Sequence, residues 1–136
     1  MVAARRSKLR KSALDAGFRS GLEQDNYNLL SDNGIGFSYE KVKIKWVSAT
    51  HTYTPDFVLD NGIIIETKGR FFGSERSKHL AIKRQYPNLD LRFVFSKSNT
   101  KLKAGSKSTY GSWCKKHGFL FADETIPIEW MKEKSK

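Results

Sequence analysis

The clearest hydrophobic pattern in the chain is a pair of apolar runs separated by a short polar turn. Phe57-Val58-Leu59 and Ile63-Ile64-Ile65 flank Asp60-Asn61-Gly62. Asn-Gly favours a tight turn because both residues tolerate the positive φ that the turn needs. The pattern therefore predicts a β-hairpin over residues 55–68, with its second run as a buried central strand.

A helical pattern precedes this hairpin, over residues 18–33. Its apolar face is followed by Gly34, a residue typical of helix C-termini, and it begins near Ser20-Gly21-Leu22-Glu23. Ser20 as N-cap with Glu23 three residues later fits a capping box. Glu23 therefore has two interpretations, either a cap partner or a third acid beside the hairpin, and its spacing favours the cap.

Two more helices are expected after the hairpin. One begins with Ser74 as N-cap and continues to about Tyr86, just before Pro87, and the other covers Thr109–His117. The segment Ile126–Trp130 is expected to be a turn that packs its tryptophan on the body of the protein.

Alternating positions predict three further strands. Gly36–Trp46 is interpreted as one long strand whose phase changes between Tyr39 and Val42, which indicates a bulge or bend. Leu89–Phe95 and the short Phe119–Phe121 are the others. Together these elements predict an α/β fold with a central mixed β-sheet flanked by helices.

Length and composition narrow the class of protein. A chain of 136 residues suits one domain, and 38% hydrophobic residues suit a modest core, which makes a partner chain plausible. No apolar run is long enough to cross a membrane, and no apolar stretch of a secretory signal follows Met1. The single Cys114 excludes an intramolecular disulfide or a Cys-rich zinc site; we expect a small buried side chain in a reducing cytoplasm.

The charge balance points to a polyanionic partner. There are 25 Lys and Arg against 14 Asp and Glu, a net charge of +11, which suits nucleic acid because neutralised phosphates release counterions. A membrane surface is the weaker alternative, and charge alone also fits a merely basic protein.

Val2–Lys11 holds five basic residues and no acid, which predicts a flexible arm on a phosphate backbone or a solvated tail.

The hairpin also carries candidate chemistry. Folding it brings Asp56 beside the end of the second strand, where Glu66 and Lys68 share one face. Two carboxylates can hold Mg²⁺, and an amine can stabilise charge on a phosphate or orient or deprotonate a water. The pattern matches the PD-(D/E)xK nuclease superfamily, although an ordinary hairpin with an exposed Glu–Lys pair matches it too.

His51 is interpreted as a surface residue before a strand, with a role beside phosphate or metal as the alternative.

Longer strings make the pattern far more specific. They are Phe18-Arg19-Ser20-Gly21-Leu22-Glu23, His51-Thr52-Tyr53-Thr54-Pro55-Asp56-Phe57, Glu66-Thr67-Lys68-Gly69, Lys78-His79-Leu80, Val94-Phe95-Ser96, Thr100-Lys101-Leu102, Tyr110-Gly111, Lys116-His117-Gly118 and Phe121-Ala122-Asp123. With these strings the chain resembles the T7-like phage endonuclease I family of four-way DNA junction resolvases, from Phe18 to about Lys132. The resemblance implies a restriction-endonuclease-like core and a Mg²⁺-dependent endodeoxyribonuclease that cuts Holliday junctions and other branched DNA.

The resemblance also implies the catalytic set. Its members would be Glu23, Asp56, Glu66 and Lys68, which reverses the preference for a purely structural Glu23. Two Mg²⁺ ions, replaceable by Mn²⁺, would be held by Asp56, Glu66, Glu23 and the carbonyl of Thr67. Residues expected to grip DNA are Arg5, Arg6, Lys8, Arg10, Lys11, Arg70, Arg76, Lys101, Lys103 and Lys107.

A domain-swapped homodimer is implied as well. Residues 1–17 would form the arm and 18–136 one nuclease domain, in which a bridge at about 41–49 crosses to the other subunit. Each site would then take Glu23 from one chain and the other three residues from its mate. The sequence departs from the family here, because the bridge is expected to be shorter and lacks the family's prolines. Two other functions fit the residues: a non-catalytic binder of branched DNA, and a nuclease for linear duplex.

Overall fold

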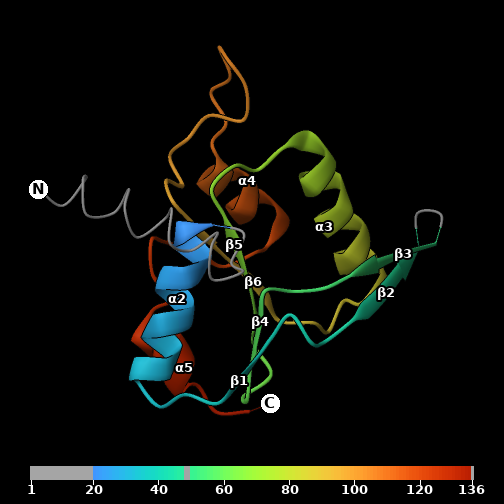
Figure 1. Ribbon diagram of the computed structural model, residues 1–136. Helices are drawn as coiled ribbons and strands as arrows, with labels where there is room; N and C mark the ends of the chain where they lie inside the picture. Colours follow the sequence, from blue (N-terminus) through green and yellow to red (C-terminus); the bar gives the residue numbers. More distant parts are fainter. Residues whose placement is uncertain (1–19, 48–49, 136) are drawn as a thin grey trace, which may run out of the picture.

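The computed structural model describes residues 20–47 and 50–135 (Figure 1). The predicted N-terminal arm, with Arg5, Arg6, Lys8, Arg10 and Lys11, lies outside these residues, as do the first two positions of the predicted first helix. The predicted role of this arm in DNA binding therefore stays a prediction.

Five strands form the central sheet, in the order β1-β4-β5-β6-β7. They are β1 Phe37–Tyr39, β4 Phe57–Leu59, β5 Ile64–Lys68, β6 Leu91–Phe95 and β7 Phe121–Asp123. β1, β4 and β5 pair antiparallel, whereas β5, β6 and β7 pair parallel. The prediction of a mixed sheet is confirmed.

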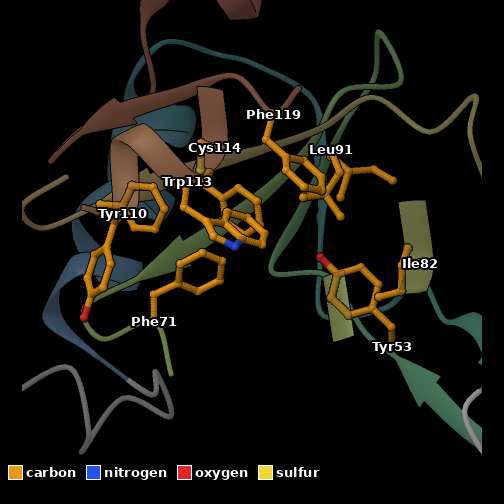
Figure 2. Packing of buried hydrophobic residues seen from close by; sticks show 11 residues of the cluster. Tyr53, Phe71, Ile82, Leu91, Tyr110, Trp113, Cys114 and Phe119 are labelled. Carbon is orange, nitrogen blue, oxygen red and sulfur yellow. The ribbon is translucent and has the colours of Figure 1, made fainter. Parts of the chain in front are cut away.

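Helices cover both faces of this sheet. α2 (Gly21–Asp32) and α5 (Ile128–Lys132) lie on one side, and α3 (Gly73–Gln85) and α4 (Tyr110–His117) on the other (Figure 1). Because neighbouring strand residues point to opposite faces, Ile64 packs toward α3 and α4 while Ile65 packs toward α2. Figure 2 shows the aromatic part of the α3–α4 side, where the ring of Phe71 meets that of Trp113 at 4.9 Å and Trp113 stacks on Phe119.

The hairpin prediction is also confirmed. Leu59 N donates to Ile63 O at 2.9 Å, and Gly62 takes a φ of +92° that a side chain would resist. Phe57 is then paired with Ile65, so the residue before β4, Asp56, lies beside the middle of β5. This register decides which polar residues meet.

Two predicted helix boundaries hold for local reasons. The Ser20 hydroxyl accepts from Glu23 N at 3.1 Å, and Gly34 is left-handed just after α2, where Ile35 N donates to Leu30 O. α4 agrees with the predicted helix Thr109–His117 to within one residue, with Thr109 as its N-cap and the left-handed Gly118 as its C-cap.

The predicted long strand Gly36–Trp46 is wrong, because the chain leaves the central sheet after β1. Glu40 has a φ of +53° there, which breaks the strand where the alternation changes phase. The remainder forms β2 (Ile44–Val47), which pairs with β3 (Thr50–Tyr53) in a separate two-stranded sheet. The predicted bend is present, but it separates strands of two different sheets and is not a β-bulge within one strand.

Three other predictions need correction. α3 begins at Gly73 with Phe72 as its N-cap and no side-chain cap bond, so Ser74 is not the cap. The last strand is Phe121–Asp123 and not Phe119–Phe121, because Phe119 turns into the core against Trp113. The predicted terminal turn is the short helix α5, and its Trp130 ring lies 5.1 Å from the Arg92 guanidinium.

No helix in the described ranges 20–47 and 50–135 has the length and apolar character needed to cross a bilayer.

Candidate metal and catalytic centre

One edge of the central sheet collects the acidic residues singled out by the sequence. β4 runs antiparallel to β5, so Asp56, just before β4, lies opposite Glu66 in the middle of β5. Both residues are buried, with exposed fractions of 1% and 3%. Buried carboxylates are rare unless they are hydrogen-bonded or bind a cation, so this edge is the candidate site.

Asp56 is held by the neighbouring strand. Its Oδ2 accepts from the backbone N of Thr67 at 2.9 Å and from Thr67 Oγ1 at 2.8 Å. Two donors on one oxygen fix the orientation of the carboxylate. Thr67 therefore positions Asp56, a role in addition to the one that its carbonyl was predicted to have.

Glu66 is poised between its charged and neutral forms. Burial raises its pKa most strongly and the charge of Asp56 raises it further, whereas Lys68 and a hydrogen bond from Tyr53 lower it; the resulting pKa of Glu66 is about 7. The Tyr53 hydroxyl donates to Glu66 Oε2 at 2.6 Å. A carboxyl in this state can exchange its proton for a cation near neutral pH.

Lys68 contacts two acids at once. Its Nζ lies 2.8 Å from Glu75 Oε2 and 3.4 Å from Glu66 Oε1. Burial works against its charge, but the two glutamates outweigh burial and raise the pKa of Lys68. The lysine is therefore an ammonium at neutral pH, which favours charge stabilisation over proton abstraction.

Two other segments, α2 and the turn after β1, each bring a further acid to Asp56. Oxygens of Glu23, from the first turn of α2, of Glu40 and of Asp56 all lie within 4.8 Å of one another. The Tyr39 hydroxyl donates to Glu23 Oε1, and Glu40 N donates to Asp56 O at 3.3 Å. Three hard oxygen donors at this spacing match the ligands of Mg²⁺. Glu66 is not part of this trio.

Sequence reasoning missed Glu40 and Glu75. Glu40 sits between Tyr39 and Lys41 with no motif around it, and the turn that aims it at Asp56 appears only in the fold. Glu75 follows Ser74 in the first turn of the predicted helix, where an acid is ordinary. Lys68 ends a strand and Glu75 lies on the next helix, seven residues later, so no spacing rule within one element links them.

The residues predicted to contact DNA differ in their surroundings. Arg70, Lys101, Lys103 and Lys107 are exposed on loops after β5 and β6, which end at the same edge because those strands are parallel. Arg76 donates to the carbonyl of Phe71 and so stabilises its loop, and its DNA contact stays a prediction. His51 is exposed and stacks on Trp46 with ring centroids 5.1 Å apart, in agreement with its reading as a surface residue.

Comparison with known proteins identifies relatives over most of the chain. The family model of phage endonuclease I matches residues 3–136. Endonuclease I of Escherichia phage T7 is 53% identical over 121 residues, which cover 88% of this chain and 81% of the relative. Endodeoxyribonuclease 1 of Enterobacteria phage T3 is 52% identical over 121 residues, which cover 88% and 80%.

Proposed function

The chain belongs to the phage endonuclease I family, and we propose that it cuts four-way junctions and other branched DNA by metal-dependent hydrolysis of phosphodiester bonds. The observation that carries this proposal is the gathering of buried Asp56 and Glu66 beside the ammonium of Lys68 at one sheet edge. Burying these charged groups costs free energy of desolvation that a purely structural role would not offset.

The donor set fits Mg²⁺, with Mn²⁺ as a substitute. Carboxylates of Asp56, Glu66 and Glu23 would hold the metal together with the Thr67 carbonyl, and Glu40 extends the set. The raised pKa of Glu66 supports this fit, because it reflects a charge that nearby anions and burial oppose and that a cation would favour. We propose two ions in each site. A bound divalent ion supplies an activated water and neutralises charge on the phosphate.

The chain's own residues perform the remaining tasks. Asp56 and Glu66 are fixed by Thr67 and Tyr53, so the site is organised before DNA arrives. Lys68, as an ammonium, stabilises the negative charge that develops on the phosphate under attack. Tyr39 holds Glu23 in the same way, through a hydrogen bond from its hydroxyl.

Basic loops beside the site would grip the arms of the junction. Arg70 and the loop with Lys101, Lys103 and Lys107 follow strands that end at the catalytic edge. Residues 1–17 would add a basic arm to the nuclease domain 18–136. Phosphate contacts carry no sequence information, so the choice of substrate depends on shape.

We further propose a domain-swapped homodimer with a restriction-endonuclease-like core, at work in the cytoplasm of the host cell. Residues 41–43 link β1 of the central sheet to β2 of the two-stranded sheet, and a bridge of about residues 41–49 would start there and cross to a second subunit. Within one chain Glu23 already lies beside Asp56. Exchange of the bridge would replace it by the Glu23 of the other subunit, so that each site would combine Glu23 of one subunit with Asp56, Glu66 and Lys68 of the other. Two sites at a fixed separation would select two opposed strands at a crossing.

The test uses a synthetic four-way junction and a linear duplex of the same sequences. With Mg²⁺ or Mn²⁺ the protein should cut the junction in preference to the duplex, and with Ca²⁺ it should bind without cutting. Glu66→Ala and Lys68→Ala should bind the junction and fail to cut it. Binding without cleavage by the unmodified protein would indicate a non-catalytic binder, equal cleavage of both substrates a linear-duplex nuclease, and cleavage in excess EDTA would exclude the metal site.

A further inference from the structure

The catalytic candidate Lys68 has an anionic partner on another element. Glu75 stands in the first turn of α3, and its Oε2 lies 2.8 Å from Lys68 Nζ, closer than the 3.4 Å to Glu66 Oε1. We propose that Glu75 is a positioning residue that holds the Lys68 ammonium at the edge of the carboxylate site. The inference rests on the nuclease function proposed above.

Lys68 needs such a partner because its side chain is long. A lysine carries its charge on a flexible four-carbon stem, and holding that charge in one place costs rotamer entropy. Glu66, the other carboxylate in contact with the ammonium, is a proposed metal ligand. A lysine held by Glu66 alone would compete with the cation for that carboxylate. Glu75 gives the ammonium an anchor outside the ligand set.

Glu75 is itself held in place. Lys78, one turn further along α3, has its Nζ 3.0 Å from the same Oε2, and this Nζ lies 5.5 Å from the centre of the Tyr53 ring. The first turn of a helix also favours a negative charge. Lys78, Glu75 and Lys68 thus form a row of alternating charge that leads from α3 to the end of β5.

The geometry separates this role from that of a metal ligand. The trio of close carboxylates consists of Glu23, Glu40 and Asp56, and Glu75 is not a member. Its Oε2 is occupied by two ammonium groups. Removing its charge should therefore slow the reaction of bound DNA while leaving metal binding and junction binding intact.

The test compares Glu75→Gln and Glu75→Asp with the matched control Glu129→Gln, a substitution of an exposed glutamate on α5. Single-turnover cleavage of a four-way junction at saturating protein and Mg²⁺ should be roughly 10- to 100-fold slower in Glu75→Gln, as is typical when a partner of a site residue is removed. Glu75→Asp, which keeps the charge, should recover most of the rate, and the control should match the unmodified protein. A rate in Glu75→Gln equal to that of the control would overturn the proposal.

Two measurements separate positioning from other roles. Mn²⁺ affinity by calorimetry and junction affinity in Ca²⁺ should be the same in Glu75→Gln as in the control, and a large loss of Mn²⁺ affinity would assign Glu75 to the ligands and overturn the proposal. The contact is also observable without cleavage, as the ¹⁵N signal of the Lys68 ammonium, identified by its absence in Lys68→Arg. That signal should broaden or vanish in Glu75→Gln, and its persistence would refute the anchor. If the unmodified protein does not cut, the proposed function fails, and the ammonium signal still decides the contact.

Discussion

The hydroxyl of Tyr53 donates a hydrogen bond of 2.6 Å to Oε2 of Glu66, and each residue is only 3% exposed. This bond joins β3 of the two-stranded sheet to β5 of the central sheet at the candidate site. It lowers the pKa of Glu66, against the effects of burial and of Asp56. Tyr53 therefore favours the ionised carboxylate that a divalent cation requires.

Tyr53→Phe is expected to weaken metal binding at neutral pH. A hydrogen bond to a charged group contributes roughly 1.5–3 kcal/mol, so Mn²⁺ affinity should fall by roughly tenfold or more. Without this donor the pKa of Glu66 rises, and the acid limb of the pH–rate profile moves to higher pH. Calorimetric titration with Mn²⁺ checks the first point, with Tyr86→Phe, at an exposed tyrosine, as control. Equal affinities in the two variants would contradict this role.

The pKa of Glu66 predicts proton release when the metal binds. Its value of about 7 exceeds the ordinary value of 4.5, so between these limits the native protein holds a proton that the unfolded chain has lost. In the absence of metal this contribution to stability is present at low pH and lost as pH rises through about 7. A cation displaces the proton, so Mn²⁺ affinity should increase up to roughly tenfold per pH unit below the pKa.

Calorimetry in two buffers of different ionisation enthalpy measures this released proton. Glu66→Gln removes the titrating group, and its weaker Mn²⁺ affinity should vary less with pH. An affinity of the unmodified protein that stays constant across this range would show that Glu66 is already ionised or does not take part.

Local signals explain which parts of the site could be predicted. The Asn61-Gly62 turn fixes the hairpin register within a few residues, and Glu66 and Lys68 share a face because strand side chains alternate. The cap at Ser20 is equally local. Both interpretations of Glu23 have support, since its backbone N–H bonds to Ser20 while its side chain meets Tyr39 and Asp56.

Contacts between distant elements could not be predicted from the pattern. Glu40 reaches Asp56 through a left-handed turn that ends β1. No neighbouring residue is of a type that predicts this turn. The run Phe119-Leu120-Phe121 fits a strand as well as the true Phe121–Asp123 does. The core decides between them, because Phe119 stacks on Trp113 while Leu120 remains exposed.

His79 predicts an acid-sensitive stability. It is fully buried among the rings of Tyr53, Phe71 and Phe93, and within the described part of the chain neither ring nitrogen has a hydrogen-bond partner. Burial, with the charges of Lys68 and Lys78, lowers its pKa to about 3 from 6.5. Between these values the unfolded chain binds a proton that the native protein does not, so stability falls as pH falls.

His79→Leu should remove this dependence. At about pH 5, protonation of this histidine in the unfolded chain lowers the free energy of unfolding by roughly 2 kcal/mol. The leucine variant has no such group, so its free energy of unfolding is not lowered in this way. Urea denaturation across the pH range should therefore show a smaller loss of unfolding free energy for His79→Leu on acidification. Curves that stay parallel for the two proteins would show that His79 is protonated in the native state.

Shared active sites predict that two inactive variants restore activity in one dimer. In a swapped dimer of one Glu23→Ala subunit and one Glu66→Ala subunit, one site receives both substitutions and the other receives neither. Co-expression with two different affinity tags isolates this mixed dimer. It should cut one strand of a four-way junction at the rate of a single intact site, while each parent dimer is inactive. In self-contained subunits every site would carry one substitution, so a mixed dimer without activity would exclude the swap while leaving the nuclease function in place.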